Sequence, residues 1–240
     1  MHRRTYLGSL VATSATSLSG CLDAIARLDS SDDPDGDIGT IPEDPRIDEP
    51  PHDIIRPELD DDLSIDERRE QWDAHYLGEH SPNEPTLAFD YLDDVDNIEG
   101  GGVDVVAGGS HIVSVYEDIS EVKAQWEDRE PLFGENPPLP DAFEAIDFDE
   151  QIVVYVAAGG GSGSTSIRWA RIESNDDTIH LHGYVLKPYV QTSDWRPRTS
   201  TVVVDRPSES LKLARASITT GEQRRVNFNS TEEAIMLNGE

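Results

Sequence analysis

The sequence has few residues of several types, and each shortage excludes a class of protein. A single cysteine, Cys21, excludes an internal disulfide framework and any metal site built from several thiolates. No apolar run reaches the roughly 18 residues that a membrane-spanning helix needs. Hydrophobic residues make up 36% of the 240 positions and aromatic residues 7%, which predicts a modest core in part of the chain.

Basic residues are also scarce, and lysine is nearly absent. Lys and Arg together number 19 against 49 acidic residues, which gives a formal net charge of −30. Like charges destabilise a compact body, but molar salt shortens the Debye length to about 3 Å and screens them. The composition therefore resembles that of proteins from extremely halophilic archaea, with an ordinary acidic surface protein as the alternative. The same charge repels phosphates, so no nucleic-acid partner is expected.

The first 21 residues have the layout of an export signal. Arg3 and Arg4 precede a weakly apolar stretch, residues 7–18, that is too short and too polar to span a bilayer. The paired arginines look like a twin-arginine signal. The Leu-Ser-Gly-Cys sequence ending at Cys21 looks like the lipobox of secreted lipoproteins, although a chance cysteine in a Ser-rich leader is the alternative. The resemblance implies signal cleavage between Gly20 and Cys21, a lipid on Cys21, and attachment to the extracellular face of the cell membrane.

A change of composition divides the rest of the chain. Residues 21–63 are dominated by Asp, Pro, Gly and Glu, which cannot bury enough surface to offset their ordering entropy. We predict a disordered acidic tether there. Ser64 to Glu67 form a capping box, so residues 64–85 are predicted to be a capped helix and linker, packed on the domain or binding a partner. Residues 86–240 are predicted to form the globular domain.

Short strands dominate that domain. The most apolar run outside the leader, residues 152–158, predicts a central buried strand. Short helices are expected over residues 120–128, 141–146 and 232–237, and the glycine-rich run 159–164 is expected to be a flexible turn. Further strands are predicted over residues 86–91, 103–107, 111–116, 166–172, 178–186, 199–204, 211–218 and 225–228. This order favours an α+β domain with a mainly antiparallel sheet and two or three short helices.

Several features between residues 111 and 207 resemble the C-terminal domain of the PrcB-type lipoproteins. They are a strand ending in Val-Tyr-Glu-Asp before a helix with Trp126, an Asp-Phe-Asp sequence at Phe148, the glycine-rich step 159–164, and an arm ending in three valines at residues 202–204. The resemblance implies a similar fold. Members of that family are associated with stabilising a surface protease complex in some bacteria, and the resemblance brings no catalytic residues.

Two histidines are the sequence's candidate metal ligands. His180 and His182 lie two residues apart on a predicted strand, so both imidazoles point to one face. Such a pair binds zinc or copper if a third ligand comes from elsewhere, and otherwise simply faces solvent. Because the sequence does not identify that third ligand, we predict no metal and no other cofactor.

Two further motifs are candidates for surface roles. Trp195, Arg196 and Arg198 form a basic, aromatic island in an acidic chain, which indicates a protein-contact patch or internal salt bridges. Asn229 begins an Asn-Ser-Thr sequon for N-glycosylation, which is compatible with surface exposure.

No nucleophile motif, thiol cluster or compact group of histidines and acids is recognisable in the sequence. We therefore expect a non-catalytic, membrane-anchored extracellular lipoprotein of a halophile that binds a protein or cell-envelope partner. The alternative is a secreted hydrolase or metal-binding enzyme with a site scattered across strands.

Overall fold

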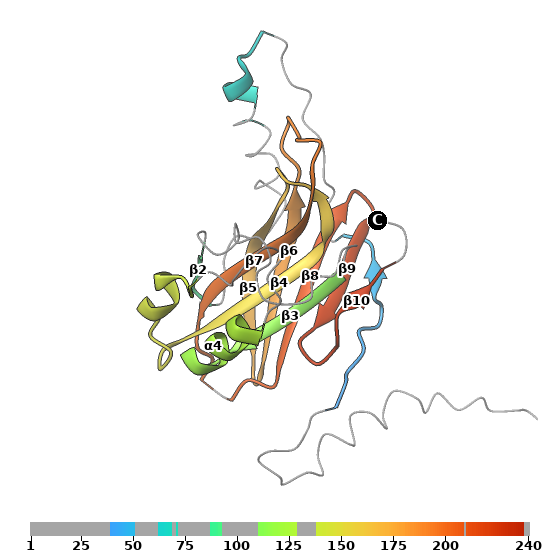
Figure 1. Ribbon diagram of the computed structural model, residues 1–240. Helices are drawn as coiled ribbons and strands as arrows, with labels where there is room; N and C mark the ends of the chain where they lie inside the picture. The colour runs from blue at the N-terminus through green and yellow to red at the C-terminus, as the bar shows by residue number, and fades with distance from the viewer. Residues whose placement is uncertain are drawn as a thin grey trace, which may run out of the picture. The chain divides into compact units, whose positions relative to one another are not determined.

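Figure 1 shows the computed structural model, which describes residues 39–50, 62–68, 71, 87–92, 110–128, 138–208 and 210–237. The strands of its first sheet are β1 (Ile47–Asp48), β5 (Ser166–Asn175), β6 (Thr178–Leu186), β8 (Leu213–Gly221) and β9 (Arg224–Asn229). The strands of its second sheet are β2 (Phe89–Tyr91), β3 (Ser110–Tyr116), β4 (Gln151–Ser162), β7 (Trp195–Asp205) and β10 (Ile235–Met236). Its helical elements are α4 (Ile119–Asp128) and the 3-10 helix η1 (Asp141–Ala145).

The strand order is β1-β9-β8-β6-β5 in the first sheet and β10-β3-β4-β7-β2 in the second. Among the described strands every pairing is antiparallel except that of β6 with β8, which is parallel. The prediction of mainly antiparallel sheet with few helices is confirmed. The hydrophobic pattern does not predict the division into two sheets. One sheet covered by helices and two sheets packed face to face would both bury the same alternating residues.

The main core lies between the two sheets. Ile152, Val154 and Val156 of β4 face the first sheet and pack in one cluster with residues such as Leu181 of β6 and Phe228 of β9. Since β4 is the middle strand of its sheet and is covered on both faces, it forms an uninterrupted apolar run rather than an alternating one. The prediction of a central buried strand over residues 152–158 is confirmed.

The other face of the second sheet is covered by α4 and η1 (Figure 1). Val122 and Trp126 from α4 and Phe143 from η1 pack on Val153 and Val203. The Trp126 and Phe143 rings meet edge to face, with centroids 6.3 Å apart. Among the described residues, no helix has both the length and the apolar character needed to cross a membrane.

Most of the glycine-rich run is part of a strand, so the prediction of a flexible turn over residues 159–164 is wrong for residues 159–162, and the turn itself is confined to residues 163–164. β4 continues through Ser162 and pairs with the beginning of β7 after a register shift between Ala157 and Gly160. A Cβ on Gly160 would lie 2.1 Å from Cζ2 of Trp195. Glycine at this position lets the Trp195 indole lie directly on the backbone of β4.

The end of the chain also differs from its prediction. Ile235 and Met236 form β10 and pair with His111 and Ser110 of β3, so the short final helix predicted over residues 232–237 is wrong. Its local helix signals are overridden by a free strand edge on β3, which accepts the chain end by hydrogen bonding.

At the beginning of the described chain, residues 39–50 belong to the domain, and we call them the strap. Ile47 and Asp48 pair with Val226 and Arg225 of β9, so the tether prediction is wrong for these residues. The reason is that polar contacts, rather than apolar burial, hold the strap, and composition does not reveal such contacts.

The predicted capping box is confirmed. The Ser64 backbone N–H donates to the Glu67 carboxylate at 2.9 Å, and the Glu67 N–H donates to the Ser64 hydroxyl at 3.3 Å. The predicted strand over residues 103–107 and the helix beyond Gln71 lie outside the described residues.

Candidate functional site

The outer face of the first sheet is polar. On β8, Ala214, Ala216 and Ile218 point into the core, so by alternation the residues between them point outward. The same alternation along β5, β6 and β9 turns a group of charged and amide side chains to this side. We call this group the polar face, and it consists of Arg171, Glu173, His180, His182, Arg215, Ser217, Arg225, Asn227 and Asn229.

Two imidazoles and a carboxylate meet on the polar face. His180 and His182 lie side by side with ring centroids 3.9 Å apart, as their spacing on one strand predicts. Nε2 of His182 lies 3.1 Å from Oε2 of Glu173. One ligand atom from each of the three side chains lies within 4.8 Å of the other two.

Glu173 is the candidate ligand that the sequence pattern did not reveal. It lies directly opposite His180 because the β5–β6 hairpin turns at Asp176 and Asp177, where Asn175 pairs with Thr178. Asp176 has a φ of 51°, the left-handed conformation that a tight hairpin turn requires. The Asn-Asp-Asp turn was recognisable in the sequence, and counting residues outward from it pairs position 173 with position 180.

Burial favours the neutral form of both histidines. The pKa of His180 is lowered to about 3, mainly by burial and to a smaller extent by the neighbouring His182 and by nearby arginines. Burial also lowers the pKa of His182, as does the positive charge of Arg171. Two neutral imidazoles beside a carboxylate can hold a metal ion, since a protonated imidazole has no lone pair to offer.

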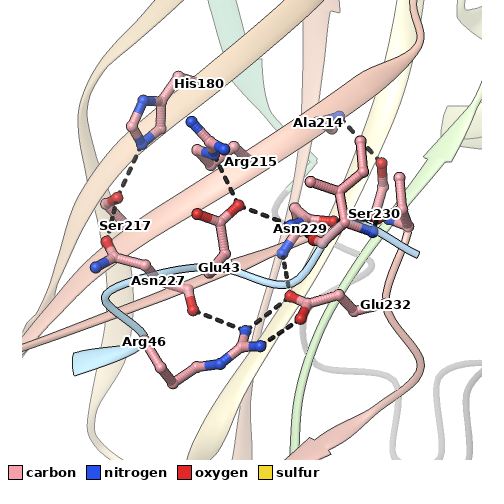
Figure 2. Close-up of polar contacts among 12 residues, drawn as sticks. Glu43, Arg46, His180, Ala214, Arg215, Ser217, Asn227, Asn229, Ser230 and Glu232 are labelled. Carbon is pink, nitrogen blue, oxygen red and sulfur yellow. Dashed lines mark hydrogen bonds and ion pairs between the residues drawn. The ribbon is translucent and has the colours of Figure 1, made fainter. Parts of the chain in front are cut away.

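A hydrogen-bond chain orients His180 (Figure 2). Nε2 of His180 lies 2.8 Å from the Ser217 hydroxyl. That hydroxyl donates to Oδ1 of Asn227 at 2.6 Å, and Nδ2 of Asn227 donates to the Pro45 carbonyl at 2.9 Å. Pro45 of the strap is therefore the last member of the series of hydrogen bonds that fixes the His180 ring.

Ion pairs hold the strap on the polar face (Figure 2). Glu43 accepts hydrogen bonds from Arg215 and from Asn229, both at 2.7 Å. Nε of Arg225 donates to Asp48 at 2.8 Å, and this hydrogen bond is the main reason why the pKa of Asp48 lies below its usual value. These contacts compensate the charges of two arginines that border the histidine pair.

Arg46 makes the most buried ion pair of the strap. Its guanidinium binds Glu232 through both of its terminal nitrogens and also donates to the Asn227 carbonyl at 3.0 Å. The Glu232 side chain is only 6% exposed, so removing Arg46 would leave a carboxylate buried without its counter-charge.

We expect Arg46→Met to lower the free energy of unfolding by about 2–3 kcal/mol, measured by urea denaturation in concentrated salt. The matched control is Arg196→Met, because the Arg196–Asp194 pair is exposed on both sides, at 55% and 44%. That change should alter stability by less than about 0.5 kcal/mol. Equal effects of the two substitutions would mean that the strap contributes nothing beyond a surface ion pair.

Only part of the basic, aromatic group formed by Trp195, Arg196 and Arg198 lies on the surface. Trp195 is 52% exposed, and Arg196 pairs with Asp194 at 3.0 Å on the surface. Arg198 instead turns inward, where Nη1 donates to the Ala158 carbonyl at 3.1 Å and Nη2 donates to the Gly160 carbonyl. The structure thus removes Arg198 from the candidate contact patch, because its guanidinium satisfies carbonyls at the register shift of β4.

Asn229 is buried, with 1% of its surface exposed. Its side-chain nitrogen, the atom that a glycan would occupy, donates to the Ile41 carbonyl and to Glu43, both at 2.7 Å. This placement argues against a glycan on Asn229 of the folded chain.

The signal and lipidation residues Arg3, Arg4, Gly20 and Cys21 lie outside the described residues, and so do the twin-arginine and lipobox motifs. The lipobox and the twin-arginine signal remain predictions for the leader, and the PrcB-type resemblance remains a prediction for the domain. No protein-family model, no curated protein and no solved structure matches this chain.

Proposed function

We propose that this chain is a membrane-anchored extracellular lipoprotein of a halophile whose domain binds a protein or cell-envelope partner without catalysing a reaction. Support for the anchor comes from the paired arginines, the short leader and the lipobox-like sequence ending at Cys21. Support for the halophilic setting comes from the net charge of −30. The α+β assignment is part of the proposal, with α4 and η1 on one face of an antiparallel sheet.

The strap shortens the proposed tether. If the lipid is on Cys21 and the domain begins at the strap, the spacer between them consists of the acidic residues 22–38. Fully extended, such a spacer reaches at most about 60 Å. The domain would therefore work close to the membrane surface, within reach of membrane proteins and of the cell envelope.

One observation carries the partner-binding part of the proposal. Among the described residues, three of the six exposed large hydrophobic side chains belong to the connection between β6 and β7 and to its junction with β7. Tyr189 is 39% exposed, Val190 50% and Trp195 52%. We call these three residues the β6–β7 patch. Exposed aromatic side chains are enriched at protein interfaces, because they bury much area at small entropic cost.

The anchor is tested with Cys21→Ser expressed as the full chain in a halophilic host. We expect the wild-type chain in the membrane fraction, beginning at Cys21 and carrying added lipid mass, and we expect the variant to lose membrane attachment. Ser30→Ala, in the proposed spacer, is the control and should behave as wild type. A full-length wild-type chain without added lipid, recovered from the cytosol, would exclude the anchor.

Crosslinking on intact cells, followed by mass spectrometry, tests the partner. We expect a crosslinked species in the wild type that is lost in Trp195→Ala. It should be retained in Met236→Ala, since Met236 is 54% exposed but lies on β10, outside the β6–β7 patch. Failure to recover any specific crosslinked species would contradict partner binding, and turnover of a substrate by purified protein would favour the hydrolase alternative.

A further inference from the structure

We propose that Glu173, His180 and His182 bind one divalent transition metal ion, such as Zn²⁺, through two imidazole nitrogens and one carboxylate oxygen. The inference is independent of the lipid anchor and of the β6–β7 patch. Two histidines and a glutamate are a ligand set that zinc takes in proteins, with a solvent molecule completing four-coordinate geometry. Imidazole and carboxylate ligands favour Zn²⁺ or Cu²⁺ over the hard cations Mg²⁺ and Ca²⁺.

The spacing of the three side chains supports this. Zn–N and Zn–O bonds of about 2.0–2.2 Å place tetrahedral ligand atoms roughly 3.3 Å apart. Nε2 of His182 and Oε2 of Glu173 lie 3.1 Å apart as a hydrogen bond. Because a carboxylate only accepts, Nε2 of His182 carries the proton here, and metal binding at Nε2 would shift that proton to Nδ1. One ligand atom from each of the three side chains lies within 4.8 Å of the other two, so the three groups converge on one position of the polar face.

The hydrogen-bond chain behind His180 determines which of its nitrogens can bind metal. The Pro45 carbonyl only accepts, so Asn227 points its amide nitrogen there and its oxygen toward Ser217. The Ser217 hydroxyl therefore donates to Asn227, and it can only accept from His180. His180 consequently carries its proton on Nε2, which leaves the Nδ1 lone pair available. Histidine ligands usually donate their second N–H to an oxygen in this way.

Three arginines border the site and would repel a cation if they were uncompensated. Each has its own carboxylate. Arg215 pairs with Glu43 and Arg225 with Asp48. Arg171 lies 2.7 Å from Oε1 of Glu173, which leaves Oε2 directed at His182. Arg171 thus orients the carboxylate that the metal needs, although its charge should make binding weaker than at a structural zinc site.

The test is isothermal titration of the purified full chain with Zn²⁺ in about 2 M NaCl with excess Mg²⁺, which screens and occupies the surface carboxylates. We expect one equivalent bound per chain. His180→Gln, His182→Gln and Glu173→Gln should each weaken binding at least about 100-fold, and Ser217→Ala about 10-fold or more. His80→Gln, which removes an imidazole elsewhere in the chain, should leave affinity unchanged.

Co²⁺ supplies a second readout, which reports the coordination geometry directly. The wild type should give the intense visible absorption of tetrahedral cobalt, and Glu173→Gln should lose it. Because the Glu173 side chain is 40% exposed, this substitution leaves the core intact. Equal Zn²⁺ uptake by all variants, or the absence of the cobalt band from the wild type, would overturn the proposal. Binding of inorganic phosphate in place of the metal would also overturn it, since the arginines would then bind the ligand instead of the histidines and Glu173.

Discussion

Replacing Phe228 with Ala is expected to lower the free energy of unfolding by about 4 kcal/mol, a large part of the roughly 5–15 kcal/mol that stabilises an ordinary domain. Phe228 is fully buried on β9 and belongs to the cluster that joins the two sheets. Its ring meets His111 of the second sheet edge to face, with centroids 5.3 Å apart. The substitution removes buried apolar surface and leaves a cavity between the two sheets. Urea denaturation in concentrated salt measures the loss.

Phe148→Ala is the matched control, because it is the same chemical change outside the inter-sheet core. Phe148 is half-buried and packs at the edge of the cluster beneath α4 and η1. We expect a loss of about 1–2 kcal/mol there. Equal losses of unfolding free energy from the two substitutions would contradict the argument, because Phe228 is fully buried between the sheets and Phe148 is only half-buried beneath α4 and η1.

Dilution of salt is expected to unfold the domain. At a net charge of −30 the repulsion among carboxylates grows as screening weakens, and below about 0.3 M NaCl the Debye length exceeds roughly 5 Å. The ion pairs of the strap respond less to salt, since Glu43 and Glu232 are 7% and 6% exposed. Repulsion across the surface therefore governs the response. Far-UV circular dichroism should show lost β-structure as NaCl is lowered.

Equal ionic strength supplied as KCl should restore the spectrum, whereas sucrose at equal osmolarity should restore it less, because sucrose screens no charge. A spectrum that stays unchanged in salt-free water would contradict adaptation to concentrated salt. It would indicate instead that the acidic residues are spread widely enough to be tolerated without screening.

Local patterns predicted the elements well where local forces decide them. The apolar run of β4, the alternation of β5 and β6, the hairpin turn at Asp176 and the capping box at Ser64 each appear in the structure as expected. In each case the determining contacts lie within a few residues, or the residue pattern reports burial directly. The pairing of His180 and His182 on one face follows for the same reason.

Long-range contacts decided what the sequence analysis missed. The strap looks like tether because its partners, such as Arg225 for Asp48, lie more than 170 positions away. The glycine run looks like a turn because Trp195, which covers Gly160, lies on a different strand. Glu173 becomes a partner of the histidines only through the register of the hairpin.

The sequence alone determined the acidic character of this protein, the lipobox-like leader and the strand-rich composition of its domain, because these depend on residue type and spacing. Only the tertiary structure decided that two sheets share one core, that the strap closes the polar face, and that Glu173 joins the two histidines. The physical reason is that ion pairs, amide hydrogen bonds and ligand sets need atoms a few ångströms apart. Strand register and sheet packing bring those atoms together, and neither is encoded in any short stretch of sequence.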